Sequence, residues 1–124
     1  MSVKVDLDRL SDTLRDFGSG YLITVGDDFH AHTVAIDPTL SDSAFHLDSA
    51  GNTTRRNVIA HPNVTLLWPP REPHGYSLIV DGRAEVHDDG LSVTPARAVL
   101  HRPAAPGTPS ASGCADDCLP LGEG

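Results

Sequence analysis

The sequence has no long hydrophobic run and few basic residues. No segment reaches the ~20 consecutive apolar residues that a membrane-spanning helix needs. Nine basic residues stand against 17 acidic ones, which gives a formal net charge of -8. This balance repels nucleic acids and anionic membranes, so neither is an expected partner. The N-terminal segment MSVKVDLDRLSD is acidic and amphipathic where a signal peptide has an apolar stretch, and we therefore expect a cytoplasmic protein.

Cysteine is confined to Cys114 and Cys118, close to the end of the chain. No disulfide framework is therefore expected in the body of the protein. The spacing Cys-x-x-x-Cys leaves open a disulfide, a redox pair, free thiols, or a zinc site completed by two further ligands. The length suits one domain, which we expect over residues 1–102, followed by a tail over 103–124 rich in proline, alanine and glycine.

Local patterns predict a helix at the start of the chain and a hairpin after it. Four apolar residues at helical spacing predict an amphipathic helix over residues 6–17. Two β-rich runs over 20–26 and 29–36 are separated by Gly-Asp-Asp. They predict a hairpin with Asp27 and Asp28 in or beside the turn.

The remaining patterns are mainly those of strands. The absence of polar alternation over residues 63–69 indicates a strand buried on both faces, and Gly82 marks a bulge inside a long strand. With about six strands and two helices, the pattern indicates a mainly β protein, a small antiparallel barrel. The elements after the hairpin are a loop over 37–42, a strand over 43–50, a helix capped by Asn52 or Thr53 and running to His61, strands over 63–69 and 76–87, and a strand or short helix over 91–101.

The segment from Ser49 to Arg56 has the ingredients of an anion site. A helix N-terminus presents free backbone N–H groups and the positive end of the helix dipole. The hydroxyls of Ser49, Thr53 and Thr54 and the guanidinium of Arg55 or Arg56 can add donors for a phosphate. Adjacent helix positions diverge, so at most one of the two arginines faces a given ligand. The alternative is a capping role for Thr53, with both arginines solvated or paired with acidic groups.

Two motifs, RRNVIAHPNVTLLW over 55–68 and VDGRAEV over 80–86, follow each other in an order typical of one family. Over residues 7–88 the chain resembles the pyridoxamine 5'-phosphate oxidase-like FMN-binding split barrels, which include flavin- and deazaflavin-dependent oxidoreductases. The resemblance implies an antiparallel six-stranded split β-barrel with a leading helix and one inserted short helix. It also implies a homodimer that holds the flavin in a cleft between its subunits.

The resemblance assigns individual residues to the cofactor site. Arg56 and Asn57 match an Arg-Asn pair of the family, and Ser49 matches the small residues that end the third strand. Thr33 lies on a strand that passes beside the flavin. Trp68 lies near the end of the buried strand over 63–69, where its ring can stack near the isoalloxazine or simply pack in the core.

The chain departs from the family at two positions. The family often has basic side chains two and four positions before the arginine of the pair, and this chain has Thr54 and Asn52 there. Arg55 is basic where the family is often small. A displaced or lost phosphate site is therefore an alternative to an ordinary FMN site.

Two further groups of residues bear on the site. His30 and His32 share a strand face and His46 follows on the next strand, but their spacing fits no metal motif, so no metal is predicted. The loop over 69–75 is expected either to rim the cleft, with Arg71 and His74 near an anionic substrate, or to be a solvated loop stiffened by proline.

Together these observations predict an FMN-binding oxidoreductase with a small-molecule redox substrate that the sequence does not name. The cofactor would carry the electrons and the protein would supply position and electrostatics, so no catalytic side chain is predicted. One alternative is a non-catalytic module on the same barrel that binds flavin, deazaflavin or haem, or no cofactor. Another is a deazaflavin-dependent reductase, whose longer acidic tail would require more basic side chains than the chain supplies.

Overall fold

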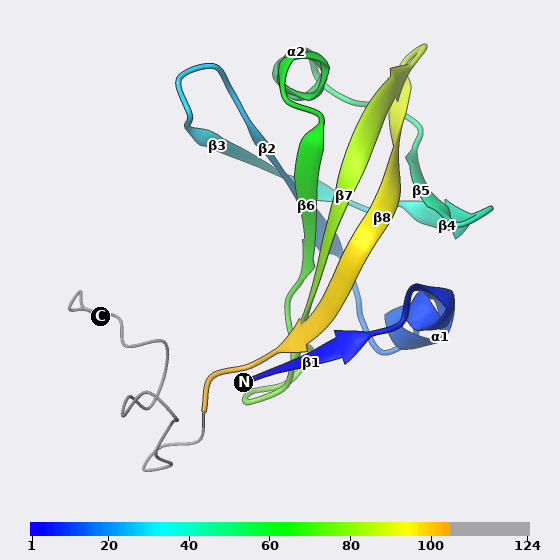
Figure 1. Ribbon diagram of the computed structural model, residues 1–124, viewed down its shortest axis with the longest axis vertical. Helices are drawn as coiled ribbons and strands as arrows, with labels where there is room; N and C mark the ends of the chain where they lie inside the picture. Colours follow the sequence, from blue (N-terminus) through cyan, green and yellow to red (C-terminus); the bar gives the residue numbers. More distant parts are fainter. Residues whose placement is uncertain (105–124) are drawn as a thin grey trace.

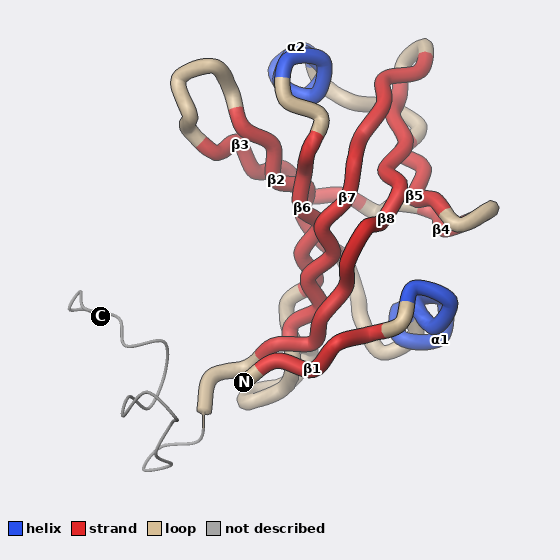
Figure 2. Tube along the Cα trace, in the orientation of Figure 1, coloured by secondary structure: helices blue, strands red, loops and turns tan. Residues whose placement is uncertain are grey.

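The computed structural model describes residues 1–104, which form one antiparallel sheet of eight strands and two α-helices (Figure 1). The strand order is β3-β2-β6-β7-β8-β5-β4, with β1 paired to β8, and the sheet curls into a half-barrel. The bounds are β1 Ser2–Val5, a 3-10 helix η1 Leu7–Arg9, α1 Leu10–Leu14, β2 Gly20–Val25, β3 Ala31–Ile36, β4 Thr39–Ser41, β5 Ala44–Leu47, α2 Asn52–Ala60, β6 Asn63–Trp68, β7 Ser77–His87 and β8 Gly90–His101. The mainly β split-barrel prediction is confirmed. Figure 2 shows how little helix the fold contains. No helix of residues 1–104 is long and apolar enough to cross a membrane.

Two strands and one helix differ from the prediction. β1 adds to the end of β8, and β4 forms a tight hairpin with β5 where a loop was predicted. Asp42 and Ser43 in that hairpin turn have φ values of 52° and 65°, as a turn between twisted strands requires. The leading helix predicted over 6–17 is confirmed but shorter, because the chain forms η1 followed directly by the five-residue α1 over residues 7–14. The tail, including Cys114 and Cys118, lies outside the described residues except for its first two.

The long strands β7 and β8 form the centre of the sheet. Their pairing shifts register between Asp81 and Gly82, which confirms the predicted bulge. A Cβ on Gly82 would lie 2.6 Å from the carbonyl oxygen of Thr94, so only glycine fits. Its partner is Pro95, whose missing N–H is tolerated at such an irregularity, and residues 91–101 are therefore strand and not helix.

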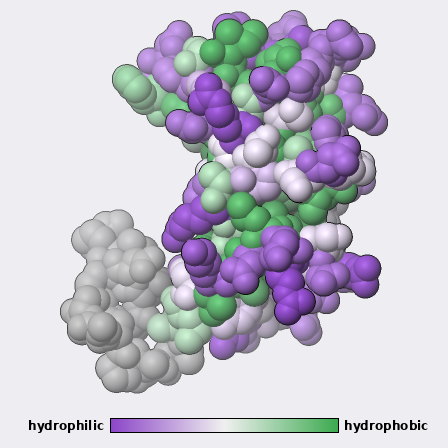
Figure 3. All heavy atoms as spheres, turned by 45° about the vertical axis from the view of Figure 1, so that its right-hand side comes forward, coloured by the Kyte–Doolittle hydropathy of each residue, from purple (hydrophilic) through white to green (hydrophobic). Residues whose placement is uncertain are grey.

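One face of the sheet carries the core and the other is only partly covered. β6 alternates, with Leu66 fully buried and its neighbours Thr65 and Leu67 only half-buried, so the prediction of burial on both faces is wrong. Cross-strand partners align Tyr21, Leu67, Ile79 and Val99 on the other face, where Val99 is buried and the other three are half-buried or exposed. None of the four belongs to the core cluster. We call these four residues the outer apolar row. Figure 3 shows hydrophilic and hydrophobic side chains interspersed over one side of the molecule.

Candidate functional site

Helix α2 begins without a side-chain cap. Gly51 takes the capping position in an extended conformation, and no side chain hydrogen-bonds there. The prediction that Asn52 or Thr53 caps the helix is therefore wrong. The first helical bond runs from the Arg55 N–H to the Gly51 carbonyl at 3.0 Å. The amides of residues 52–54 precede this bond and have no partner within the helix, so they are available to an anion.

Two adjoining pockets lie along α2, and His32 and Thr53 line both of them. The pocket at the helix N-terminus has a volume of about 400 Å³ and is lined by Ser49, Thr53 and Thr54. The pocket along the helix side has a volume of about 450 Å³ and is lined by Arg56 and Asn57, among others. We call the two together the α2 groove. It lies between α2 and the β2–β3 hairpin, and it brings together five of the eight residues predicted for cofactor binding.

The two arginines diverge, as expected for adjacent helix positions. Arg55 is half-buried, and its Nη1 donates to the carbonyl of Gly90 at 3.4 Å, toward the β7–β8 turn. Arg56 is exposed and lines the α2 groove. Among residues 1–104, no carboxylate forms an ion pair with Arg56. Its guanidinium is therefore the one that an anion in the groove can meet.

Asn57 links α2 to the sheet. Its side chain is 6% exposed, and its Nδ2 donates to the Oγ1 of the fully buried Thr24 in β2 at 3.0 Å. This buried bond stabilises the fold because it gives the Thr24 oxygen a donor and the Asn57 amide an acceptor. Asn57 thus sets the position of α2 against β2, in addition to lining the groove.

Thr33 and Trp68 do not line the α2 groove. Thr33 is exposed on the opposite side of β3 from its neighbours His32 and Val34, which do line the groove. Trp68 is 3% exposed and its ring centroid lies 5.4 Å from that of Phe45 in the core. Strand alternation separates Thr33 from His32 and Val34, but which side of β3 meets α2 depends on how the strand packs.

The far end of the groove is acidic. Near the C-terminus of α2, His61 Nε2 lies 2.8 Å from Asp27 Oδ1. The Asp28 carboxylate lies 3.0 Å from both the backbone nitrogen and the Nδ1 of His30. The backbone N–H of His30, more than its imidazole, lowers the pKa of Asp28 below its ordinary value. An anion is therefore favoured at the N-terminal end of α2 and disfavoured at this end.

Two other predicted features lie apart from the groove. The loop over 69–75 follows the end of β6 that is far from α2, so within one chain it does not rim the groove (Figure 1). His46 Nε2 lies 3.2 Å from the Ser41 carbonyl oxygen. In the part of the chain that the structure describes, no three His, Cys, Asp or Glu residues gather as a metal site.

Two curated relatives match nearly the whole chain. They are uncharacterized proteins of Mycobacterium bovis and Mycobacterium tuberculosis, each 45% identical over 133 aligned positions that cover 94% of this chain and 94% of the relative. The chain belongs to the same family as these two mycobacterial proteins. A scan against protein-family models found no match.

Solved structures identify the type of barrel. A Listeria innocua protein provisionally named pyridoxamine 5'-phosphate oxidase superposes with a TM-score of 0.63 at 14% identity, over 76% of this chain and 96% of that one. The chain therefore has the same split-barrel fold as this pyridoxamine 5'-phosphate oxidase-like protein. An FAD-binding protein of Mesorhizobium loti shares this split barrel with a TM-score of 0.64 at 15% identity, covering 81% and 96% of the two chains. An F420 reductase shares it with a TM-score of 0.53 at 16% identity, covering 69% and 91%.

Proposed function

We propose that the α2 groove binds the phosphate end of a flavin-type cofactor, FMN in the first instance, and that the protein is an oxidoreductase. The observation that carries the proposal is the convergence of two kinds of donor on one groove. The uncapped N-terminus of α2 offers backbone amides, and Arg56 offers a guanidinium without an ion pair among residues 1–104. The names of the FAD-binding and F420 reductase neighbours support a cofactor of this class.

The residues of the groove fit such a group. Thr53 and Ser49 add hydroxyl donors at the helix N-terminus, and no acidic residue lies in the first turn of α2. Val34 and Leu47 give the same pocket an apolar wall that a flat ring can contact. A bound flavin would supply the electron transfer, and these residues would bind and orient it. The redox substrate is a small molecule that the groove does not identify.

A single available guanidinium favours FMN over a cofactor with a longer anionic tail. Asn52 and Thr54 are uncharged, and the acidic far end of the groove would repel further negative groups. A deazaflavin is therefore the less favoured cofactor. The same lack of basic side chains favours a second candidate function, a module that binds flavin, deazaflavin or haem without turnover.

A homodimer is part of the proposal. In the outer apolar row Tyr21 is 39% exposed, Leu67 and Ile79 are half-buried, and Val99 is buried. A second copy would bury this face and remove apolar surface from water. We expect Leu67→Arg to shift the protein from dimer to monomer in light scattering after size exclusion. A wild-type monomer at high concentration would contradict the homodimer.

Fluorescence titration with FMN, riboflavin and a deazaflavin tests the cofactor. We expect FMN to bind more tightly than riboflavin, since only FMN has the phosphate. Arg56→Ala should weaken FMN binding by about 1.5–3 kcal/mol, the scale of a charged hydrogen bond, and should leave riboflavin unaffected. Arg55→Ala is the matched control, because Arg55 contacts the Gly90 carbonyl. Equal losses in both variants, or equal affinity for FMN and riboflavin, would refute the phosphate site.

If FMN binds, turnover separates the two candidate functions. Reduction of the bound flavin by NADH or NADPH, followed by reoxidation with an added acceptor, supports the oxidoreductase. A flavin that binds but remains oxidised with both donors, and is not reoxidised by acceptors after chemical reduction, supports the binding module.

A further inference from the structure

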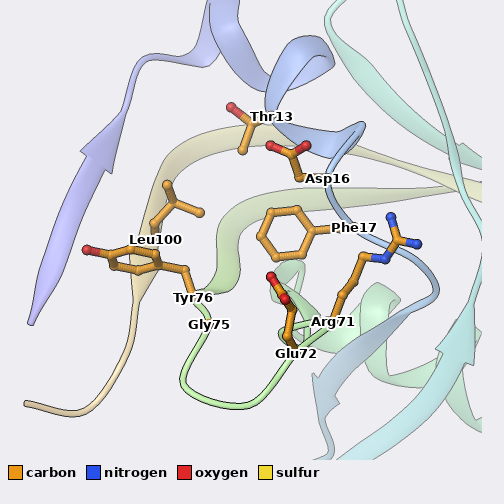
Figure 4. Close-up of a pocket in the computed structure, with 8 residues that line it drawn as sticks. All are labelled: Thr13, Asp16, Phe17, Arg71, Glu72, Gly75, Tyr76 and Leu100. Carbon is orange, nitrogen blue, oxygen red and sulfur yellow. The ribbon is translucent and has the colours of Figure 1, made fainter. Parts of the chain in front are cut away.

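A second pocket lies at the opposite end of the sheet from the α2 groove. It has a volume of about 650 Å³, which is within the range of small-molecule sites. It is formed by the end of α1 and the residues that follow, by the β6–β7 loop, and by β8 (Figure 4). We call it the α1 pocket. Its lining residues are Thr13, Asp16, Phe17, Arg71, Glu72, Gly75, Tyr76 and Leu100.

The base of the α1 pocket is apolar. Phe17 and Leu100 are partly buried and pack against the core, so their positions are set by the fold. In Figure 4 the carboxylates of Asp16 and Glu72 appear on either side of the Phe17 ring, and Tyr76 and Leu100 lie along one edge. The pocket therefore offers a flat apolar surface with charged groups around it.

The wall formed by Tyr76 and the β6–β7 loop is already fixed by contacts within the protein. The guanidinium carbon of Arg102 lies 4.4 Å from the Tyr76 ring centroid, a cation–π contact that covers one ring face. The loop turns tightly at Gly75, whose N–H donates to the Glu72 carbonyl at 3.1 Å. A Cβ on Gly75 would approach both that carbonyl and Pro70 at just over 3 Å, so the turn has little space for another residue. Preorganised walls lower the entropic cost of binding.

The hydrogen-bonding groups of the pocket are mostly acceptors. The Thr13 hydroxyl donates to the Arg9 carbonyl at 2.9 Å, and the Tyr76 hydroxyl donates to the Met1 sulfur at 3.6 Å. Both hydroxyls therefore have their hydrogens engaged and present lone pairs to a ligand. The carboxylates of Asp16 and Glu72 are acceptors as well. Arg71 is the one charged donor among the lining residues, since the Arg102 guanidinium lies over the Tyr76 ring.

The charge of the lining residues also favours a cationic ligand. Among the lining residues two carboxylates stand against one guanidinium, and a second guanidinium, that of Arg102, lies over the Tyr76 ring. Among residues 1–104 neither carboxylate forms an ion pair. The net charge of -8 on the whole chain adds a field that attracts cations and repels anions. An anionic substrate near Arg71 is therefore less favoured than a cation.

We propose that the α1 pocket binds a protonated amine attached to a flat apolar body, with the ammonium group between Asp16 and Glu72 and the body against Phe17 and Leu100. An ammonium has three donors and no acceptor, which complements the acceptors of the pocket. An aromatic body matches the ring of Phe17, and the nearby carboxylates favour the cationic end. The proposal is independent of the cofactor proposed for the α2 groove.

Tryptamine and indole-3-propionate are a matched pair of probes, because they share the indole and the two-carbon chain and differ in the sign of the terminal charge. We expect tryptamine to produce saturable shifts of the backbone amide signals of Thr13, Gly75 and Leu100 in two-dimensional NMR. The signals of Thr53 and Arg56 in the α2 groove should remain in place. Indole-3-propionate should bind at least tenfold more weakly. Equal binding of the two probes, shifts confined to the α2 groove, or no saturation at millimolar tryptamine would each overturn the proposal.

Removal of the two carboxylates tests the role of charge. The double variant Asp16→Asn, Glu72→Gln should weaken tryptamine binding by about three- to tenfold, an effect reduced by the exposure of both groups. Asp8→Asn is the control, because Asp8 is an exposed acid of η1 that does not line the pocket. Unchanged affinity in the double variant would overturn the proposal. If the double variant does not fold, the comparison of the two probes on the wild-type protein still decides.

Discussion

The turn between β2 and β3 holds a phenylalanine where glycine is favoured. The Phe29 N–H donates to the Gly26 carbonyl at 2.9 Å, and the Gly26 N–H donates to the His30 carbonyl at 3.1 Å. Phe29 closes this turn with a φ of 64°, in the left-handed region, and 82% of its surface is exposed. A bulky residue in that conformation is unusual, because its Cβ crowds the backbone.

We predict that Phe29→Gly gives a more stable protein than Phe29→Ala. Both variants lose the same exposed ring, so their difference isolates the backbone conformation. A left-handed residue with a Cβ costs ~1–2 kcal/mol, and the greater freedom of glycine in the unfolded chain offsets ~0.5–1 kcal/mol of that. The glycine variant should therefore be more stable by about 1 kcal/mol. For a domain of this size that difference corresponds to a Tm about 4–8 °C higher.

Thermal and urea unfolding followed by circular dichroism would measure the difference. The urea slopes of the two variants should agree, so that the midpoints report stability alone. If the alanine variant is as stable as the glycine variant, Phe29 does not have a positive φ in solution and the turn assignment is refuted. If both variants are much less stable than the wild type, the Phe29 ring makes stabilising contacts in solution, contrary to its 82% exposure in this structure.

Three further predictions concern stability. Asn57→Ala should destabilise the protein by about 1–3 kcal/mol in urea unfolding, because it removes the partner of a buried Thr24 hydroxyl; a change below about 0.5 kcal/mol would mean that the bond does not form. Gly90→Ala should prevent stable folding or cost more than about 3 kcal/mol, since its Cβ would overlap the backbone carbonyl at the end of β5, and a normal Tm would contradict this close approach. The pKa of Asp28 is lowered in the folded state, so its stabilising effect is present above its ordinary pKa of 3.8 and is lost as the pH falls through the lowered value. Asp28→Asn should therefore make stability less dependent on pH below about 4, and an unchanged acid limb would count against the interaction with His30.

Features with local signals could be predicted from the sequence. The β2–β3 hairpin, helix α2 and the bulge at Gly82 each depend on a few contiguous residues. β1 and β4 could not be predicted in this way, since the strand partner of β1 lies about a hundred residues away and β4 has only three residues. Local propensity contains no information about such distant partners.

The same distinction, between local signals and contacts with distant residues, applies to the candidate site. A single motif supplies the arginine pair and α2, and helix geometry correctly predicted that the two side chains diverge. Which arginine faces the groove depends on where the β7–β8 turn lies, and that is a property of the tertiary structure. Thr33 was selected from the right strand but the wrong side. The distance of the 69–75 loop from α2 depends on the length and direction of β6, which the motif alone does not reveal.

The pairing of β1 with β8 brings the N-terminus of the chain next to residue 102. The Met1 amine donates to the Arg102 carbonyl at 2.9 Å, and the Arg102 N–H donates to the Met1 carbonyl at 3.0 Å. Figure 1 shows the N-terminus beside the end of β8. A short glycine linker could therefore join residue 102 to residue 1, and the chain could be reopened at the exposed turn of Asp42 and Ser43. Such a circular permutant would retain every strand pairing of the described fold, while its new ends would lie on the β4–β5 hairpin.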